Sequence, residues 1–451
     1  MIPRVKKNGY SWVSLVVLCA ALVAAMPQPA AGASLCVNPT GAFGCFTTIG
    51  AAVAAASAND VINVGAGTYA EDVVIGKPLS LLGAGLSATI INAAGLANGI
   101  YIDGRDNPGL SKVAVTGFTV ENANYEGILV TSASVVTISG NLVQGNNINL
   151  VITTTTCTAQ PSFETDEGFD CGEGIHLSGV DHSVVANNVV ENNAGGIRLS
   201  DDTGQTYNNV VAGNLVRNNP FDCGITLASH APAPGSAAPH LGVVHNTIIG
   251  NTSMHNGYQV PGAGAGVGIF ADGTGVGLNS GNVVAYNMLL NNGIPGVAFH
   301  SHVGPNFGLP ADDLSDNVIV GNQISGNGAD FFDTATPGPT GINVSSGGGG
   351  TPITGTVISE NTITGQAQDI VFNTPAEVDM HLNNLLGSGM GVDNLASGTA
   401  NASQNYWGCA GGPGASGCTS VSGSGVLASG ILTSQFYPRG ILPVGVPAPA
   451  P

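Results

Sequence analysis

The 451-residue sequence has few charged and few aromatic side chains. Charged residues make up 8% of the chain and aromatic residues 5%, while hydrophobic residues reach 43%. Because such a composition can bury a large core, it argues against a disordered chain. Only 9 lysines and arginines stand against 28 acidic residues, which gives a net charge of −19. This charge repels nucleic acid and anionic lipid, and it would repel an acidic polysaccharide unless a cation bridged the two.

Several sequence signatures are also absent. No CxxC pair or Cys/His cluster has the spacing of a zinc site, and no EF-hand pattern occurs. The L-x-x-L-x-L pattern of leucine-rich repeats is missing, and so are the longer, aromatic-marked blades of a propeller. These absences remove the commonest metal-binding and repeat architectures from consideration.

Residues 1–33 predict a signal peptide that is cleaved on export. Arg4, Lys6 and Lys7 precede the apolar run 12–23, and Ala31-Gly32-Ala33 supplies the small residues of a cleavage site. A membrane anchor is the alternative, but the apolar run is too short to span a bilayer comfortably. We therefore expect a secreted protein, extracellular, periplasmic or at the cell surface, with no membrane span in the mature chain.

What the sequence does contain is a repeat, clearest between residues 174 and 219. Two successive lines there share Gly-Ile-x-Leu-Ser, a variable turn, Val-Val, Asn and a closing Asn-Asn. The Gly that precedes a short apolar strand recurs at Gly127, Gly174, Gly196, Gly224, Gly268, Gly296 and Gly341. Asparagines five residues apart recur as Asn141/Asn146, Asn188/Asn193, Asn214/Asn219, Asn246/Asn251, Asn287/Asn292 and Asn322/Asn327, with Asn361/Gln366 as a variant.

The repeat predicts an all-β solenoid. Its apolar segments are short and rich in Val and Ile, so they favour strands over helices. A coil of about 22 residues with three short strands closes on itself, and the next coil stacks about 4.8 Å away. Asn tolerates the left-handed backbone of the turns, and stacked turns would build Asn ladders. We predict a single-stranded right-handed parallel β-helix over residues 34–430.

Both ends of the solenoid are expected to carry caps, because an open strand edge invites aggregation. Residues 46–58 predict a short helix that begins at Thr47 or Thr48, within an N-terminal cap of about 36–60. At the other end, Trp407 would cover the core inside a cap of about 401–420. Residues 431–451 form a Pro-rich tail.

The cysteines predict three disulfide-closed loops. Cys36 and Cys45 enclose one short Gly-rich loop and Cys409 and Cys418 another, as suits an exported chain. Cys157 and Cys171 flank a third loop. Cys223 is not assigned to a pair, because it and Cys171 precede Gly-Ile strands two coils apart. That separation is about 9.6 Å, which is beyond disulfide reach.

The chain resembles the secreted bacterial β-helix proteins of the pectin-lyase-like superfamily. The resemblance covers roughly residues 36–418 and is carried by CFTTIGAAVAAASANDVINVGAGTYAEDVVIGKPLSLLGAG, by the Asn/Gly coils and by NYWGCAGGPG. It implies the fold and leaves the activity open, since that superfamily includes lyases, hydrolases, esterases, epimerases and adhesins. The Asn-x-Asp, Gly-His-Gly and Arg-x-Lys motifs of polygalacturonases and the Asp-Pro-His-Asp motif of alginate epimerases are missing. Arg198 beside Asp201 and Asp202 partly resembles the pectate lyase pattern.

Candidate site residues are the outward-facing polar groups of the Gly-Ile strands and the turns that follow them. In Gly-Ile-x-Leu the residue x points outward, which predicts the column His176, Arg198, Thr226, Phe270, Ala298 and Asn343. Paired carboxylates suit glycoside hydrolysis, and a base with a cation or Arg suits elimination from a uronic acid. The predicted catalytic residues are His176, Arg198, Asp201, Asp202 and His230. The predicted substrate-binding residues are Asp181, His182, Phe270, Asp272, His300 and His302. The alternative is that solvent-facing strand and turn positions are polar in any case.

An acidic insertion before the His176 strand suggests a cation site. It contains Glu164, Asp166, Glu167, Asp170 and Glu173, and carboxylate oxygens suit Ca²⁺. The predicted ligands are Glu167, Asp170 and Glu173. A solvated acidic loop without an ion is the alternative.

Two functions remain open from the sequence. The first is a monomeric carbohydrate-active enzyme, a polysaccharide lyase or glycoside hydrolase, that binds a polysaccharide or cell-surface glycan beside His176 and Arg198. The second is a non-catalytic, adhesin-like or surface-structural β-helix. The polar column favours the first, and the missing catalytic motifs and scarce aromatic residues favour the second.

Overall fold

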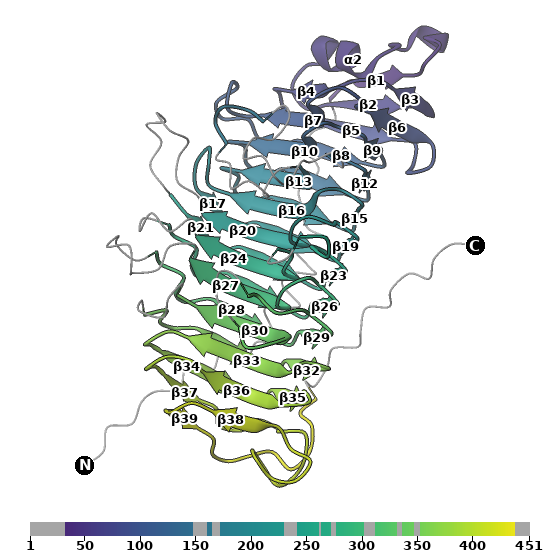
Figure 1. Cartoon of the computed structure of the whole chain (residues 1–451). Coiled ribbons are helices and arrows are strands. Elements are labelled where there is room, and N and C mark those ends of the chain that lie inside the picture. The colour runs from purple at the N-terminus through teal and green to yellow at the C-terminus, as the bar shows by residue number, and fades with distance from the viewer. Residues whose placement is uncertain are drawn as a thin grey trace.

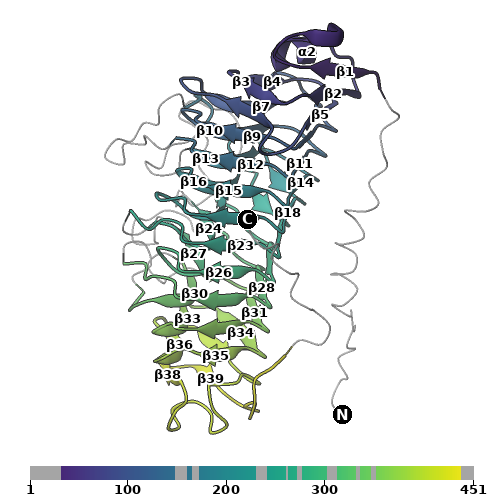
Figure 2. The ribbon, with the colours of Figure 1, turned by 90° about the vertical axis from the view of Figure 1, so that its right-hand side faces the viewer.

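The computed structural model is a parallel β-helix, as the repeat predicted (Figure 1). It describes residues 32–147, 160–164, 172–229, 241–260, 263–271, 277–301, 312–331, 336–346 and 352–437. Coils stack from the N-terminal end to the C-terminal end, and three long parallel sheets run along the stack (Figures 1 and 2). None of the described helices has the length and apolarity that a membrane crossing requires.

The strands of successive coils form three parallel sheets that run along the stack, called A, B and C. Sheet A contains β1 (Ser34–Val37), β2 (Asp60–Val64), β5 (Leu79–Gly83), β8 (Ala114–Thr116), β11 (Thr137–Ser139), β14 (Val184–Ala186), β18 (Val210–Ala212), β22 (Thr247–Ile249), β25 (Val283–Ala285), β28 (Val318–Val320), β31 (Val357–Ser359), β34 (Glu377–His381), β37 (Thr399–Asn401) and β39 (Val426–Leu427). Sheet B contains β3 (Gly67–Tyr69), β6 (Thr89–Asn92), β9 (Thr119–Glu121), β12 (Leu142–Gln144), β15 (Val189–Glu191), β19 (Leu215–Arg217), β23 (Thr252–Met254), β26 (Met288–Leu290), β29 (Gln323–Ser325), β32 (Thr362–Thr364) and β35 (Asn384–Leu386). Sheet C contains β4 (Val73–Ile75), β7 (Asn98–Asp103), β10 (Glu126–Thr131), β13 (Glu173–Ser178), β16 (Gly195–Ser200), β20 (Ile225–Ser229), β24 (Val267–Ala271), β27 (Val297–Ser301), β30 (Thr340–Ser345), β33 (Gln368–Asn373), β36 (Met390–Asn394) and β38 (Ser420–Ser422). Short strands β17 (Thr206–Tyr207) and β21 (Val243–Val244) pair separately.

Each coil visits sheets A, B and C in turn, and like residues stack on like. β13 pairs with β16 so that Ile175 meets Ile197 and Leu177 meets Leu199, and all four side chains are buried. Alternate residues of a strand point to opposite faces, so these aliphatic side chains fill the coil interior. The residue between them points outward, which puts His176 beside Arg198.

The Gly of the Gly-Ile signature is required by close packing inside the coil. A Cβ on Gly174 would overlap Cγ1 of Val190 and lie 2.7 Å from Nδ2 of Asn193. Sheet B therefore approaches the start of the sheet C strand too closely for a side chain there. The repeat marks this position with Gly because of that contact.

Asparagine ladders run along the turns, as the sequence predicted. Each Nδ2 of the first ladder donates to Oδ1 of the next member over 2.9–3.1 Å, through Asn141, Asn188, Asn214, Asn251, Asn287, Asn322, Asn361, Asn383 and Asn405. A second ladder joins Asn146, Asn193, Asn219, Asn256, Asn292 and Asn327 over 2.8–3.3 Å. These buried amides satisfy one another and the backbone of neighbouring coils.

The pair Asn246/Asn251 is offset by one ladder from the other pairs with this spacing. Asn246 belongs to a third ladder, in which Asn209 donates to Asn246 and Asn246 donates to Asn282. Asn251 is instead followed in its coil by Asn256, a member of the second ladder. The five-residue spacing occurs twice in succession in these coils, so spacing alone could not fix the frame.

A helix closes the N-terminal end of the stack, as predicted. Helix α2 (Ile49–Ala55) buries Ile49 and Val53 against the first strands (Figure 1). Thr48 Oγ1 accepts a hydrogen bond from the Ala51 amide at 3.2 Å, which makes Thr48 the N-cap. The helix is shorter than residues 46–58, because Phe46 pairs with a strand and the backbone is extended at Ala56.

The predicted disulfides at the two ends are confirmed. Cys36 bonds to Cys45 with a Cα–Cα distance of 4.8 Å, and Cys409 bonds to Cys418 with 5.0 Å. Trp407 is fully buried in the last coils and belongs to the same continuous core as the stacked aliphatic residues. The core is therefore closed by a helix at one end and by an indole beside a disulfide loop at the other.

Candidate functional site

The outer face of sheet C carries the column that begins at His176. His176 pairs with Arg198 on β16, and Arg198 pairs with Thr226 on β20. Farther along, the register places Ala298 beside Asn343, as expected. The first part of the predicted column is therefore correct.

Phe270 is not a member of this column, which corrects the sequence prediction. Thr226 pairs with Gly268, and Phe270 pairs with Ala228 in the next outward column. Val267, which follows Gly266, takes the place of the first Ile of the signature. Gly266 and Gly268 both precede an apolar residue, and Gly268, rather than Gly266, was aligned with the Gly of the Gly-Ile signature in the sequence prediction.

A compact group of polar side chains lies on and beside β10, β13 and β16, around His176 and Arg198. We call it the sheet C cluster, and its members are Tyr125, Glu126, Glu164, Glu173, His176 and Arg198. Every member is at most 5% exposed, and His176 and Arg198 are 0% exposed. These outward-facing side chains are therefore buried rather than exposed, and Glu164, from the connection between β12 and β13, contacts His176 and Tyr125 here.

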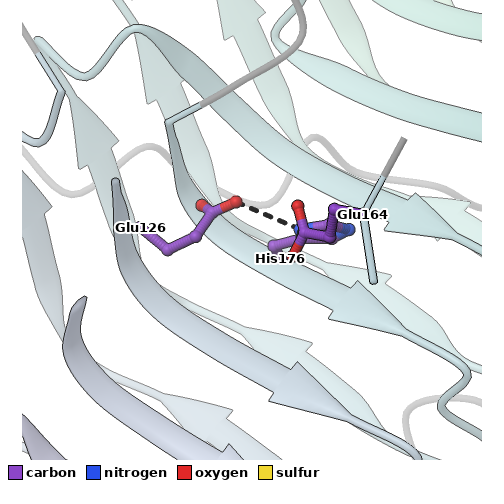
Figure 3. Close-up of side chains that lie close together, drawn as sticks. All are labelled: Glu126, Glu164 and His176. Atoms are coloured by element: carbon purple, nitrogen blue, oxygen red, sulfur yellow. Dashed lines mark hydrogen bonds and ion pairs between the residues drawn. The ribbon is translucent and has the colours of Figure 1, made fainter. Parts of the chain in front are cut away.

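His176 is held from two sides within the cluster. Its Nδ1 lies 3.1 Å from Oε1 of Glu126 and 3.6 Å from Oε1 of Glu164 (Figure 3). Its Nε2 lies 2.8 Å from Oγ of Ser200. The hydroxyl of Tyr125 donates to Oε2 of Glu164. The imidazole is thus fixed in orientation, with Nδ1 directed at two carboxyl groups.

Arg198 supplies the positive charge of the cluster. Its Nη1 lies 3.7 Å from Oε1 of Glu173 on the neighbouring strand. Register places Ile128 beside Ile175, so Glu126 and Glu173 occupy equivalent positions on adjacent strands. One guanidinium therefore stands among several buried carboxyl groups.

Burial shapes the acid–base properties of the cluster. It raises the pKa of Glu126 well above the usual value, and repulsion from Glu173 and Glu164 adds to the effect while Arg198 opposes it. Burial, followed by the Asp202 carboxylate, raises the pKa of Glu164 to about 8. Burial also raises the pKa of Tyr125. These raised pKa values favour the protonated, neutral forms of Glu126 and Glu164.

The two carboxyl groups of the predicted Asp201–Asp202 pair have different surroundings. Oδ2 of Asp201 accepts hydrogen bonds from Oγ of Ser229 at 3.0 Å and from the Gly242 amide at 2.9 Å. Asp201 therefore supports the turn of the next coil. Asp202 is buried and close enough to Glu164 to raise its pKa, so it lies at the margin of the sheet C cluster.

Asp181 and His182 form an exposed dyad away from the Gly-Ile strand. Nδ1 of His182 lies 2.6 Å from Oδ1 of Asp181, and the His182 side chain is 55% exposed. The imidazole meets the Tyr207 ring edge-on, with centroids 5.5 Å apart. Asp181 bridges to residues that lead into sheet A. Both stay predictions as substrate-binding residues.

Phe270 and His300 form a second buried group on sheet C. Their rings stack with centroids 4.2 Å apart, and Nδ1 of His300 lies 3.7 Å from Oδ2 of Asp330. Both side chains are less than a tenth exposed, and Phe270 packs with Ala265 and Ala298. Their predicted substrate-binding role is untested, and the contacts show a packed group rather than an open surface.

The remaining predicted site residues lie outside the described part of the chain. They are His230, Asp272, His302, Glu167, Asp170, Cys157 and Cys171.

Sequence reasoning missed four residues of this region: Tyr125, Glu126, Ser200 and, as a site residue, Glu164. Glu126 had a signal, because Glu-Gly-Ile occurs at both 126–128 and 173–175. Ser200 is the last residue of the Gly-Ile-x-Leu-Ser motif, so it was interpreted only as a repeat position. Glu164 could not be placed, since nothing in the sequence fixes how a long connection folds back.

One group of described residues has metal-ligand geometry. Ligand atoms of Glu126, Glu164 and His176 all lie within 4.8 Å of one another (Figure 3). The predicted calcium ligand Glu173 instead faces Arg198. A cation site can therefore be built here, but from residues other than those predicted.

Comparison with known proteins supports the fold. Residues 87–274 match the family described as right handed beta helix region. Together with three parallel sheets along the stack of coils, this confirms the predicted single-stranded right-handed parallel β-helix. No curated protein sequence matches the chain.

Solved β-helix structures resemble the chain over most of its length. An alginate lyase from Paenibacillus sp. str. FPU-7 is 12% identical, with 88% of this chain and 99% of that chain covered and a TM-score of 0.42. The Dettilon tailspike protein is 14% identical, with 81% and 62% covered and a TM-score of 0.49. The A-module of a mannuronan C-5 epimerase from Azotobacter vinelandii is 15% identical, with 85% and 93% covered and a TM-score of 0.45. At these identities and TM-scores the likeness says nothing of the activity of this chain.

Proposed function

We propose that this chain is a secreted carbohydrate-active enzyme, a polysaccharide lyase or a glycoside hydrolase, whose reacting groups belong to the sheet C cluster. The observation that carries the proposal is the position of Arg198 among carboxyl groups on the outer face of adjacent strands. The fold requires aliphatic residues inside the coil, but it does not require an arginine, an imidazole and several carboxyls together outside it. Such costly groupings concentrate at functional sites.

The chemistry of the cluster suits an acidic polysaccharide. Elimination from a uronate needs a positive group beside the substrate carboxylate, and Arg198 can fill that role. It also needs a group that removes a proton, and hydrolysis needs two carboxyl groups in different environments. Glu173 lies beside Arg198, and Asp202 lies near Glu164, so both could supply carboxyl groups. Asp201 is left out, since it holds the Gly242 backbone.

Secretion is part of the proposal. Two disulfide-closed loops suit an oxidising compartment, and residues 1–33 have the pattern of an export signal. We expect a monomer that meets a polysaccharide or cell-surface glycan outside the cytoplasm. N-terminal sequencing of protein recovered from the medium or periplasm tests this, and a mature chain that still begins with residues 1–33 would contradict it.

A non-catalytic glycan-binding or surface-structural β-helix is the second candidate. The burial of His176 and Arg198 favours it, because a polymer cannot touch groups that are 0% exposed unless the residues that cover them move. In that case the sheet C cluster has a structural role and stabilises the outer face of the coils.

A panel of neutral and acidic polysaccharides separates the two candidates. New reducing ends indicate hydrolysis, and the absorbance of unsaturated uronate indicates elimination. Turnover by the wild type should be lost in Asp202→Asn and Arg198→Lys but kept in Arg217→Lys, a control whose ion pair with Glu191 lies on sheet B. Retention of a glycan without turnover supports the second candidate. If the protein neither retains nor cleaves any glycan of the panel, both candidate functions are overturned.

A further inference from the structure

The tautomer of His176 determines whether its Nδ1 carries a proton or a lone pair toward Glu126 and Glu164. Oγ of Ser200, 2.8 Å from Nε2, can accept a hydrogen bond from that nitrogen. Nδ1 then carries a lone pair that faces Oε1 of Glu126 at 3.1 Å and Oε1 of Glu164 at 3.6 Å. Three electron-pair donors would meet at one point, and only a positive ion or a proton between them removes the repulsion.

A proton on Nδ1 satisfies too little of this group. One N–H can serve Oε1 of Glu126, but Oε1 of Glu164 and Oε2 of Glu126 accept no hydrogen bond from the described residues. Both glutamate side chains are 0% exposed. Buried oxygen atoms in native proteins are rarely left without a partner, so these two point to a missing proton or cation.

We infer that Glu126, Glu164 and His176 bind a divalent transition-metal ion, with Zn²⁺ as the best fit. A tetrahedral ion with bonds of about 2.0–2.1 Å holds its ligand atoms about 3.3 Å apart. The two distances from Nδ1 of His176, 3.1 and 3.6 Å, lie on either side of that value. The ligands come from β10, the Gln160–Glu164 segment and β13, so the ion would tie a surface connection to sheet C (Figure 3).

The donor set distinguishes this ion from calcium. Ca²⁺ takes six to eight oxygen ligands, whereas an imidazole with carboxylates suits Zn²⁺ and its first-row neighbours. Two of the proposed ligands are also held by hydrogen bonds from behind, because Ser200 orients His176 and Tyr125 donates to Glu164. With the ion bound, His176 is a ligand, so it is not the base of the proposed enzyme.

The full chain, stripped with a chelator and then incubated with Zn²⁺ alone, tests the site. We expect one tightly held zinc per chain by elemental analysis. Glu126→Gln and His176→Ala should weaken zinc binding more than about 100-fold, and Ser200→Ala about 10- to 100-fold. Glu191→Gln and His255→Ala, matched changes on other faces, should bind as the wild type does. Wild-type protein without stoichiometric zinc, or variants that bind unchanged, would overturn the inference.

A spectroscopic measurement on the wild type covers the case in which a variant fails to fold. Co²⁺ in a site with nitrogen and oxygen ligands should give a visible spectrum unlike that of aqueous Co²⁺, and Zn²⁺ should abolish it. A spectrum identical to that of the aqueous ion would contradict the site. Neither measurement uses a glycan, so the metal site and the proposed enzyme can fail independently.

Discussion

The guanidinium of Arg198 lies 3.7 Å from the carboxylate of Glu173, and both side chains are buried on adjacent strands of sheet C. Replacing Arg198 with Met removes the one positive charge and leaves the carboxyl group among other acids. We expect the free energy of unfolding to fall by about 3–5 kcal/mol, as when one partner of a buried pair is lost. Urea denaturation of the two proteins measures this.

Arg217→Met is the matched control for this change. Its partner is Glu191 at 2.6 Å, but the Arg217 side chain is 42% exposed. An ion pair so open to water contributes at most about 1 kcal/mol. Equal losses in the two variants would contradict a special role for burial at Arg198.

An asparagine in the middle of a ladder is expected to matter more than one on the surface. Asn251→Ala removes the acceptor of Asn214 and the donor to Asn287, both fully inside the stack. Each buried amide left without a partner costs about 1–3 kcal/mol, so a loss of several kcal/mol is expected. Asn63→Ala, whose exposed amide bonds to Ser34, should change stability by less than about 1 kcal/mol. Thermal denaturation of both variants gives the comparison, and similar melting temperatures would refute it.

Asp369 predicts a pH dependence of stability. Burial raises its pKa well above 3.8, although the Gly387 amide donates to it at 3.1 Å and lowers the pKa in part. Since the folded pKa exceeds the unfolded one, the folded protein holds the proton longer. Stability from this group is present below the unfolded pKa and is lost as the pH rises through the folded pKa.

Asp369→Asn keeps the acceptor for Gly387 and removes the titration. We expect the variant to melt above the wild type at pH 8, with the advantage disappearing toward pH 4. Calorimetry across that range measures the difference. Asp379→Asn, at a side chain 46% exposed, is the control. A constant difference between Asp369→Asn and the wild type at every pH would contradict the argument.

Trp407 closes the core, and its removal should open a cavity there. Trp407→Ala is expected to lower the free energy of unfolding by about 3–5 kcal/mol. Phe43→Ala removes an aromatic side chain that is fully exposed at the tip of the first disulfide loop, so it should change stability by less than about 0.5 kcal/mol. Denaturation midpoints for the pair test this, and a small loss at Trp407 would show that the last coils need no indole cover.

The coil architecture could be predicted from the sequence because it depends on local periodicity. Ile175 and Ile197, and the Asn residues after them, occupy the same place in every coil, so residue types alone reveal the stack. The errors came where that periodicity is ambiguous. Gly266 and Gly268 offer two frames for one strand, and Asn246 fits two ladders.

The candidate site was harder to predict, because burial on the outer face depends on connections that do not repeat. His176 and Arg198 were found as departures from the repeat, and register alone brings them together. Both are buried, and His176 contacts Glu164, which is 12 residues away in sequence and outside the strands of the coils. No periodic signal encodes such a contact, so the ligand partner of His176 could not be read from spacing.

The asparagine ladders make the coil, rather than the residue, the unit in which this chain can change length. Each ladder amide is satisfied by the coil before and the coil after it, as Asn214 is by Asn188 and Asn251. Loss or gain of one whole coil would join Asn188 directly to an equivalent amide and leave no donor stranded. Loss of a few residues within a strand would misalign every ladder at once. Sequence length can therefore vary freely only in whole turns or in the connections beside sheet C, where the proposed metal ligand Glu164 lies.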